Sequence, residues 1–376
     1  MPVADSSLAT ELRKQKPRDS NNVPRTMLAA VYRGDSRVAA EEVATPLITD
    51  DEVLIQVEAC GICHTDLKKI QHNLLAPPRI YGHETAGVVA WAGDKVRQYS
   101  PGDRVIVFHH VPCGECFYCV RRLYAQCAVY KRVGVTAGFE PAGGGFAQYV
   151  RVMSWIVKRG MERIPAGVSF DQACWVEPVN TCLKGVVMLG LREDDMVAVL
   201  GQGPIGLIFT MLVKRTGARV IASDTISHRL TLSAELGALA ADGRTEEFER
   251  LVRRETDERG ADAVIVATNV PGLVDQALKI SRPGAKILLF AQTSAAERIE
   301  ISGADICVGE RILLGSYSAD VDLQAESARL VFGGDLPLEN LVSHRVSLME
   351  INDGITTALY PSERSLKVVV RPQEAL

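Results

Sequence analysis

A glycine-rich turn between an apolar strand and a helix constrains the fold of this chain more than any other feature. The turn reads Gly201-Gln202-Gly203-Pro204-Ile205-Gly206 and follows the apolar run MVAVL at 196–200. Gly201 permits a tight turn, Gly203 lets the backbone approach a pyrophosphate at the helix N-terminus, and Gly206 allows close packing of helix on strand. The motif predicts a dinucleotide-binding domain in which the three glycines, Pro204 and Ile205 lie at the cofactor. The alternative is a glycine-rich turn in some other doubly wound domain.

An acidic residue at the end of the next strand indicates which dinucleotide is bound. The run RVIAS at 219–223 is followed by Asp224, 18 residues after Gly206. A carboxylate at this place accepts hydrogen bonds from the adenosine ribose and repels a 2′-phosphate, so it favours NAD over NADP. Arg229 can instead bind that phosphate, so Asp224 and Arg229 are both candidates for contact with the cofactor.

Apolar strands alternate with helical segments through the second half of the chain. After the two strands already named, further runs lie at 262–267, 286–290 and 311–316. Continuous apolar strands separated by helices are typical of a parallel sheet that is covered on both faces. A helical stretch at about 321–332 and a closing strand at 366–370 follow.

The preceding part of the chain has a different pattern. Residues 27–157 contain short β-branched runs bounded by Gly, Pro or Asp. In the run 52–59, Val53, Ile55 and Val57 are expected to point to one face. The absence of regular alternation with long helices predicts an irregular β domain, so the chain as a whole is α/β with two domains.

Composition limits where the protein works and what it binds. The chain carries 42 basic and 46 acidic residues, a formal net charge of −4, which favours neither nucleic acid nor an anionic membrane as partner. No apolar run is long enough to span a bilayer, and the N-terminus has no secretory apolar segment. Nine cysteines without an export signal predict reduced thiols, and hence a cytoplasmic protein.

Four of the cysteines lie close together in one loop. They are Cys113, Cys116, Cys119 and Cys127. Four thiolates in a closed tetrahedral shell describe structural zinc, which holds a loop that has too little core of its own. Iron–sulfur ligation also uses four thiolates, although no other feature indicates electron transfer. Uncoordinated thiols are the remaining alternative.

A second set of possible metal ligands is dispersed along the chain. Cys63 follows a strand, His83 and Glu84 are neighbours, and Glu177 lies where the β half gives way to the nucleotide half. One Cys, one His and one or two Glu make a mixed shell with room for water or substrate, as in catalytic zinc sites. Cys174 is a rival third ligand.

Seven motifs in a fixed order together resemble one protein family. They are G-I-C-H-T-D, G-H-E-x-A-G, the four-cysteine loop, G-G-x-F-A-x-Y, E-P-V, G-x-G-x-x-G and S-L-K-V-V-V. From about Met27 to Pro372 the chain resembles the zinc-dependent alcohol dehydrogenases of the medium-chain dehydrogenase/reductase superfamily. The resemblance implies a GroES-like β-barrel catalytic domain and a doubly wound Rossmann cofactor domain, with active-site zinc in the cleft between them.

The resemblance also implies domain boundaries. Residues 27–178 would form the first part of the catalytic domain, 179–316 the NAD-binding domain, and 317–376 the second part of the catalytic domain. Residues 1–26 are polar and charged, and we expect a flexible N-terminal arm.

Roles for individual residues follow from the matched motifs. The resemblance implies Cys63, His83 and Glu177 as catalytic zinc ligands, Glu84 as the acid that can replace water on the metal, and Thr65 as the hydroxyl that hydrogen-bonds the substrate oxygen. Asp66 would orient a zinc ligand. His64 and Lys367 match positions that contact cofactor phosphate.

Two departures bear on the substrate. Yeast-type alcohol dehydrogenases have a proton-relay His where this chain has Lys68, so the resemblance implies only the first relay step, at Thr65, and leaves the rest to the ribose hydroxyl and water. The Glu-Pro pair at Glu177 instead resembles the polyol, sorbitol and threonine dehydrogenase branch.

The leading functional hypothesis is a zinc- and NAD-dependent dehydrogenase that reversibly oxidises a secondary alcohol or polyol to a ketone, with one catalytic and one structural zinc per chain. A dehydrogenase for primary alcohols or aldehydes is the alternative within the family. Zinc-free quinone reductases share the scaffold, but the intact ligand set argues against them. A catalytically idle binding relative is the alternative outside enzymes. The resemblance further implies a homodimer or homotetramer.

His109 and His110 precede the cysteine loop, and we expect them to be hydrogen-bonded residues at the edge of the barrel, with reach into the substrate cleft as the alternative. Cys60, Cys182 and Cys307 are expected to be packed interior thiols, with Cys60 and Cys307 in strands.

Overall fold

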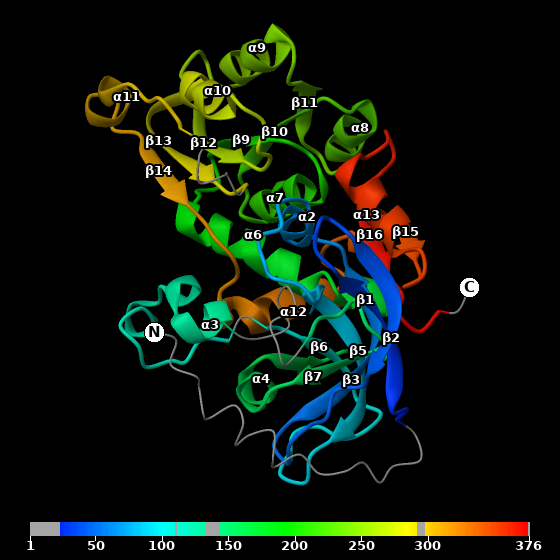
Figure 1. Cartoon of the computed structure of the whole chain (residues 1–376). Helices are drawn as coiled ribbons and strands as arrows, with labels where there is room; N and C mark the ends of the chain where they lie inside the picture. The colour runs from blue at the N-terminus through cyan, green and yellow to red at the C-terminus, as the bar shows by residue number, and fades with distance from the viewer. Residues whose placement is uncertain (1–22, 110, 133–142, 292–297, 375–376) are drawn as a thin grey trace, which may run out of the picture. The chain divides into compact units, whose positions relative to one another are not determined.

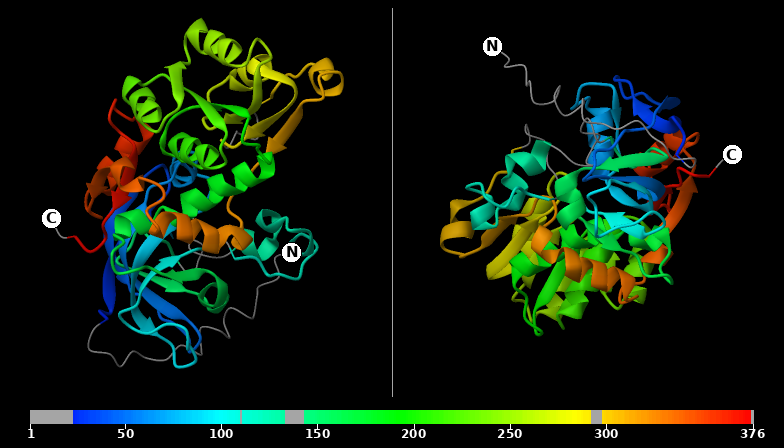
Figure 2. Two further views of the ribbon diagram at one scale, coloured as in Figure 1. Left: turned by 180° about the vertical axis from the view of Figure 1, so that it is seen from behind. Right: turned by 90° about the horizontal axis from the view of Figure 1, so that it is seen from below.

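The computed structural model describes residues 23–109, 111–132, 143–291 and 298–374. It divides the chain into two compact units (Figures 1 and 2). The first extends to Glu177 and also contains Gln324–Pro361 and the residues from Lys367 onward, and the second consists of Pro178–Leu323 and Ser362–Leu366. The sequence predicts boundaries after 178 and 316 and no return segment at 362–366. The expected N-terminal arm and His110 lie outside the described residues, apart from the arm's last four.

The first unit is built on β-sheet. Its strands are β1 (Thr26–Tyr32), β2 (Val38–Ala44), β3 (Val53–Gly61), β4 (Arg79–Ile80), β5 (Glu84–Ala92), β6 (Arg104–Val107), β7 (Tyr149–Val152), β8 (Met161–Arg163), β15 (Val342–Val346) and β16 (Lys367–Val370). The larger sheet has the order β15-β16-β3-β5-β6-β8, with β7 paired to β3, and the smaller has the order β2-β1-β4. All pairings except β15–β16 are antiparallel.

Strand β3 shows why these residues form a sheet. Val53, Ile55 and Val57 are fully buried, whereas Gln56 and Glu58 are partly exposed, as the alternation predicts. The three valine and isoleucine side chains belong to the main core of this unit. Burial of a whole face fixes the register, because a slip of one residue would expose all three side chains.

Short helices complete the first unit. They are α2 (His64–Gln71), α3 (Ala128–Arg132), α4 (Ser154–Arg159), α5 (Phe170–Ala173), α12 (Gln324–Phe332) and α13 (Ile351–Leu359), with 3₁₀ turns η1 (Cys119–Arg121), η2 (Tyr124–Gln126) and η5 (Leu338–Leu341). Helix α6 (Val176–Leu189) begins at the end of this unit and continues into the second.

The second unit contains one parallel sheet. Its strands are β9 (Met196–Leu200), β10 (Arg219–Asp224), β11 (Leu239–Asp242), β12 (Ala261–Val266), β13 (Ser281–Leu289) and β14 (Ile312–Gly315). The order is β11-β10-β9-β12-β13-β14, and every described pairing in it is parallel. This is the strand order of a Rossmann fold, in which ligands bind at the carboxyl ends of the strands. The predicted doubly wound fold class is confirmed.

In the part of the chain that the structure describes, five helices connect these strands: α7 (Pro204–Arg215), α8 (Ser227–Glu235), α9 (Glu246–Glu255), α10 (Leu273–Ile280) and α11 (Gly303–Cys307), with a 3₁₀ turn η4 (Val321–Leu323) after β14. The apolar runs of the sequence correspond to strands β9, β10, β12, β13 and β14. Strand β11 has no such run, because it is a short edge strand with Leu239 exposed. Among the described residues, no helix is both long and apolar enough to cross a membrane.

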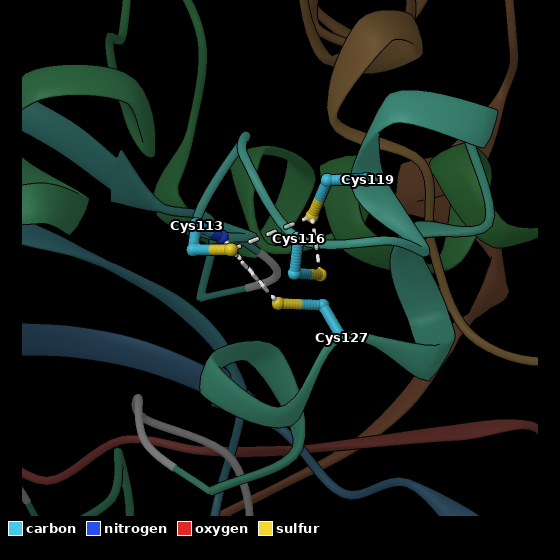
Figure 3. Close-up of side chains that lie close together, drawn as sticks. All are labelled: Cys113, Cys116, Cys119 and Cys127. Carbon is cyan, nitrogen blue, oxygen red and sulfur yellow. Dashed lines mark hydrogen bonds between the residues drawn. The ribbon is translucent and has the colours of Figure 1, made fainter.

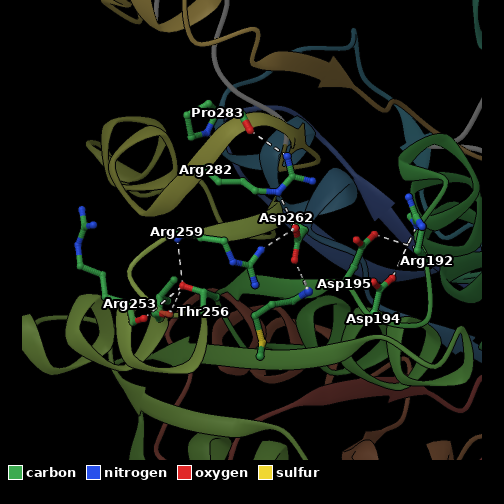
Figure 4. A network of polar contacts seen from close by, with 12 residues as sticks. Arg192, Asp194, Asp195, Arg253, Thr256, Arg259, Asp262, Arg282 and Pro283 are labelled. Carbon is green, nitrogen blue, oxygen red and sulfur yellow. Dashed lines mark hydrogen bonds and ion pairs between the residues drawn. The ribbon is translucent and has the colours of Figure 1, made fainter.

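A polar network fixes the amino ends of the central strands (Figure 4). The carboxylate of Asp262 in β12 accepts a hydrogen bond from the Met196 amide of β9 at 2.7 Å and from Arg282 Nε of β13 at 2.5 Å. The Asp262 side chain is only 10% exposed, so both contacts are sheltered from water. The network therefore ties three neighbouring strands together at the sheet edge opposite their carboxyl ends.

The cysteines outside the two candidate metal sites have different surroundings. Cys60 in β3 and Cys182 in α6 are fully buried, as predicted. The prediction for Cys307 is wrong, because this thiol is exposed at the end of α11. The apolar residues around it form a five-residue helix with no buried side chain instead of a strand.

Candidate functional site

The four cysteines of the loop face one another (Figure 3). The sulfur of Cys113 lies 3.8 Å from that of Cys119 and 3.6 Å from that of Cys127, and Cys116 and Cys119 are 3.5 Å apart. A Zn–S bond of about 2.3 Å implies sulfur–sulfur edges of about 3.8 Å in a tetrahedron. A disulfide would need about 2.05 Å. The four thiols therefore fit one tetrahedral ion.

Local hydrogen bonds favour the thiolate form of Cys116 and Cys127. The backbone amide of Cys119 lowers the pKa of Cys116. Burial raises the pKa of Cys127, but hydrogen bonds from the amides of Cys113 and Tyr130 and from the neighbouring thiols outweigh that effect. Together they lower the pKa to about 6. Burial raises the pKa of Cys119 to about 12. The loop's own core is small and contains two of the cysteines, so the metal would supply much of the cohesion.

The dispersed ligand candidates meet in the first unit. One ligand atom each from Cys63, His83 and Glu84 lie within 4.8 Å of one another. His83 is 3% exposed and Glu84 is 2% exposed, whereas Cys63 is partly exposed. Cys63 precedes α2, and His83 and Glu84 lie where β5 begins. A partly open, mixed N/S/O group of this kind suits a catalytic zinc.

Asp66 holds two members of this group in place. Its Oδ1 lies 3.0 Å from His83 Nδ1, and its Oδ2 accepts a hydrogen bond from the Cys63 amide at 3.4 Å. The Cys63 sulfur in turn accepts from the Thr65 amide at 3.4 Å, so Cys63 is the N-cap of α2. Because Asp66 engages Nδ1, the other ring nitrogen of His83 is left for a metal.

Charge raises the basicity of His83. Burial lowers its pKa, but the carboxylate of Asp66 and the sulfur of Cys63 together raise it well above the ordinary value. The His83 ring also packs edge-on against His109, with ring centroids 5.4 Å apart. The sequence favours a hydrogen-bonded structural role for His109, with reach into the substrate cleft as the alternative. A histidine pair directly before the cysteine loop is the only signal that pointed to it.

Glu84 forms a buried ion pair with Lys367 of β16. The Lys367 ammonium also donates to the Ile62 carbonyl at 3.1 Å and lies 5.4 Å from the Trp175 ring centroid. Burial lowers the pKa of Lys367, but Glu84 and Cys63 raise it above its usual range. The sequence predicts a phosphate contact for Lys367, and the structure places its ammonium beside the ligand group.

Glu177 is not a member of the three-residue group. It lies in the first turn of α6 and is 8% exposed. Its pKa is raised to about 7: burial is the main cause, Glu84 and Asp66 add to the rise, and His83 and Lys367 oppose it. Its carboxylate therefore interacts electrostatically with the group. The rival ligand Cys174 is also outside the group, and its sulfur donates to the Asp171 carbonyl at 3.1 Å.

The remaining predicted residues of the first unit lie on α2. His64 is exposed, and Thr65 and Lys68 are partly exposed. Thr65 lies in the first turn of α2, two residues after Cys63, which is the N-cap of that helix and a predicted metal ligand.

The glycine turn of the second unit has the expected geometry. Gly201 has φ +92°, and a Cβ on Gly206 would lie 1.8 Å from the Gly201 carbonyl oxygen. Both positions therefore require glycine for the fold itself. A Cβ on Gly203 would meet nothing closer than an Arg229 nitrogen at 3.8 Å. The protein leaves Gly203 open at the N-terminus of α7, as close approach by a phosphate requires.

Asp224 ends β10 beside this turn. It accepts hydrogen bonds from the amides of Gln202 at 2.6 Å, Thr225 at 2.7 Å and Ile226 at 2.9 Å. Arg229 Nη1 lies 3.8 Å from the carboxylate, and Arg229 Nη2 donates to the Ser365 carbonyl at 3.2 Å. Burial lowers the pKa of Arg229, and Asp224 partly offsets that shift. The acid and the base of the predicted ribose site are thus neighbours.

Comparison with known proteins agrees with both units. Residues 49–161 match the family model of the alcohol dehydrogenase GroES-like domain, and residues 204–331 match that of the zinc-binding dehydrogenases. The chain belongs to the zinc-type medium-chain alcohol dehydrogenases. It is therefore an oxidoreductase that takes zinc and a nicotinamide cofactor.

Individual members of this family resemble the dehydrogenase over nearly its full length. Sorbitol dehydrogenase of Bacillus subtilis is 29% identical over 94% of this chain and 99% of its own. D-arabinitol dehydrogenase 1 of Uromyces fabae is 26% identical over 94% of this chain and 99% of its own. A structure described as a zinc-binding dehydrogenase from Sinorhizobium meliloti bound to NADP has a TM-score of 0.84 and 29% identity, covering 93% of this chain and 100% of that one.

Proposed function

We propose that this dehydrogenase oxidises a secondary alcohol or polyol to a ketone, reversibly and with NAD as hydride acceptor. The observation that carries the proposal is the Cys63–His83–Glu84 group with Asp66 behind it, because an open mixed shell leaves a position for an alcohol oxygen. The relatives named sorbitol dehydrogenase and D-arabinitol dehydrogenase 1 support a polyol substrate.

Two zinc ions per chain belong to this proposal. Cys113, Cys116, Cys119 and Cys127 would hold a structural ion, and Cys63, His83 and Glu84 or Glu177 a catalytic one. Zinc in the second site, when bound, supplies Lewis acidity toward the alcohol oxygen. The ion pair with Lys367 supports a site in which Glu84 and Glu177 alternate as the third zinc ligand. Glu84 already has a buried counter-charge, Lys367, when it is not bound to the metal.

The residues around the Cys63–His83–Glu84 group have separate roles in the reaction. Thr65 hydrogen-bonds the substrate hydroxyl and accepts its proton, while the adjacent C–H bond gives its hydride to the nicotinamide and the carbon becomes a carbonyl. Asp66 keeps His83 in the tautomer that a metal requires. Lys68 occupies the place of a relay histidine, so the proton leaves Thr65 by water or the cofactor ribose.

A preference for NAD over NADP follows from Asp224 and is the second part of the proposal. Its carboxylate accepts a hydrogen bond from the Gln202 amide of the glycine turn and would face the adenosine ribose. The open Gly203 would contact the pyrophosphate, and the family resemblance implies the same for His64. Because Arg229 lies 3.8 Å from Asp224, removal of the acid frees the guanidinium for a 2′-phosphate. We expect Asp224→Ala to lower the NAD/NADP ratio of kcat/KM by about tenfold or more. An unchanged ratio would remove Asp224 from this role.

The chain also carries features that support self-association as a homodimer or homotetramer. The edge strand β14 has an exposed Ile312 and no charged side chain, a type of edge that associates readily. All nine cysteines are free thiols, which supports a reducing compartment such as the cytoplasm.

The deciding experiment combines metal analysis with a substrate screen. Purified protein should contain about two zinc ions per chain, and NAD reduction should be fastest with secondary alcohols or polyols. Primary alcohols, sugar phosphates and hydroxy amino acids complete the screen. Fastest turnover of primary alcohols would favour the alternative dehydrogenase. Two bound zinc ions without turnover of any substrate would favour an idle relative.

A further inference from the structure

Helix α8, which carries Arg229, is attached to the second unit differently from its neighbours. Helix α7 buries the eight consecutive residues Gly206–Val213, and α9 buries three apolar side chains. All nine residues of α8 are described by the structure, and only one of them, Ser233, is buried. A helix with so little buried apolar surface is weakly restrained by packing, so its polar contacts determine more of its position.

The side chain of Gln202 makes the polar contact at this buried serine. Gln202 is fully buried inside the glycine turn, and its Oε1 accepts hydrogen bonds from the Ser233 hydroxyl at 2.9 Å and from the Thr210 hydroxyl of α7 at 3.0 Å. Its Nε2 donates to the Val199 carbonyl of β9 at 3.3 Å. One side chain therefore joins a central strand to the two helices that follow it.

The backbone of Gln202 holds the acid that precedes α8. Its amide donates to the Asp224 carboxylate at 2.6 Å, and the other oxygen of that carboxylate accepts from the amides of Thr225 and Ile226. Ile226 is the N-cap residue of α8. Gln202 thus fixes the acid through its amide and the helix through its side chain, and its complete burial keeps it out of direct contact with a cofactor.

We infer that Gln202 is a positioning residue that holds Asp224 and α8 in place for recognition of the adenosine ribose. The inference rests on the role of Asp224 proposed above and adds a residue to which the G-x-G-x-x-G motif assigns no function. Because Gln202 acts on the adenosine half of the cofactor site, its loss weakens cofactor binding and leaves the hydride-transfer step unchanged.

ADP-ribose is the probe for this inference, because it contains the adenosine half of NAD and needs no alcohol substrate. Gln202→Met keeps the length of the side chain and removes its hydrogen bonds. We expect calorimetry to show about tenfold weaker binding of ADP-ribose to the zinc-loaded full-length variant. The variant should fold, because the Ser233 hydroxyl has a second acceptor, the Arg229 carbonyl, at 2.8 Å. Unchanged affinity would overturn the inference.

Ser233→Ala and Thr210→Val form a matched pair, since each removes one hydroxyl from the same Gln202 oxygen. Ser233→Ala should weaken ADP-ribose binding by about three- to fivefold. Thr210→Val should change it by less than about twofold, because the buried residues of α7 already hold that helix. Equal losses in the two variants would contradict a role through α8. So would full additivity of Gln202→Met with Ser233→Ala, because residues that act through one contact are not additive.

Two further measurements separate positioning from general destabilisation and from the proposal beneath. With the alcohol that turns over fastest in the substrate screen, Gln202→Met should raise the KM for NAD by about tenfold and leave kcat within about twofold. A lower kcat with an unchanged KM would indicate a merely structural role. Asp224→Ala that weakens ADP-ribose binding, beside Gln202→Met that does not, would refute this inference alone. Unchanged binding in Asp224→Ala would refute the proposed ribose contact and the inference with it.

Discussion

The two metal-ligand groups of this dehydrogenase differ in what surrounds them. The cysteine loop brings four identical ligands from 15 consecutive residues, and its surroundings are mostly solvent and its own thiols. The Cys63–His83–Glu84 group brings three different ligands, two of them buried, and adds Asp66, Glu177 and Lys367 as charged neighbours. A closed shell needs only its ligands to hold an ion. An open shell that performs chemistry needs surrounding charged residues, which orient its ligands and balance the charge of those ligands.

Removal of one ligand from each group is the strongest test of this division. Cys63→Ser should lower kcat by about a thousandfold or more, because the polarising ion contributes several kcal/mol to the transition state. The melting temperature should change little, since the partly exposed Cys63 is not part of the core. Steady-state kinetics and thermal unfolding check both parts. Retained turnover would contradict the assignment of the open site.

The complementary substitution, Cys127→Ser, should damage stability more than chemistry. Zinc content should fall to about one ion per chain, and the loop should become protease-sensitive as several kcal/mol of local stability are lost. Cys307→Ser is the matched control, because that thiol is exposed and outside both groups. Metal analysis and limited proteolysis measure the effect. A loop that keeps its protection without the ion would show that its packing suffices.

The role of Asp66 can be tested with a nearly isosteric change. Asp66→Asn removes the charge beside His83 Nδ1, and we expect zinc affinity at the open site to fall by about 10- to 100-fold. The cysteine loop should keep its ion at the same chelator concentration. Competition with a chromophoric chelator resolves the two sites. Equal loss from both sites would mean that the substitution perturbs the whole unit.

The buried Glu177 predicts a pH dependence of the metal-free protein. Its pKa is raised to about 7 in the folded chain, so the folded state binds more protons than the unfolded state between about pH 4.5 and 7. Stability should therefore fall as the pH rises through this window. Glu177→Gln should remove that loss and stabilise the metal-free protein by roughly 2–3 kcal/mol at pH 8, with little effect at pH 4.5. Parallel denaturant titrations at the two pH values measure this, and a pH-independent difference would contradict it.

The sequence predicts local features of this molecule better than distant ones. Strands β9, β10 and β12 follow from continuous apolar runs, and the cysteine loop follows from spacing, because each is encoded within a few neighbouring residues. Cys63 and Glu177 are 114 residues apart, so only the family resemblance joined them in a site.

Features set by tertiary contact were not predictable in this way. The ion pair between Lys367 and Glu84 joins β16 to β5, and no local pattern encodes it. Strand β11 forms by pairing with β10 rather than from its own apolar content. The error at Cys307 has the same origin, because its neighbours form a short exposed helix where the sequence alone suggests a packed strand.

The network around Asp262 has a practical consequence for engineering. The strands of the parallel sheet are tied at one end by side chains that are independent of the loops at the other end. Loops that follow β9 and β10 can therefore be exchanged with those of a relative without shifting the strands beneath them. Replacing the residues after Asp224 with those of a relative would leave the strands in their present positions. The preference for NAD or NADP can therefore be altered by exchanging loops alone.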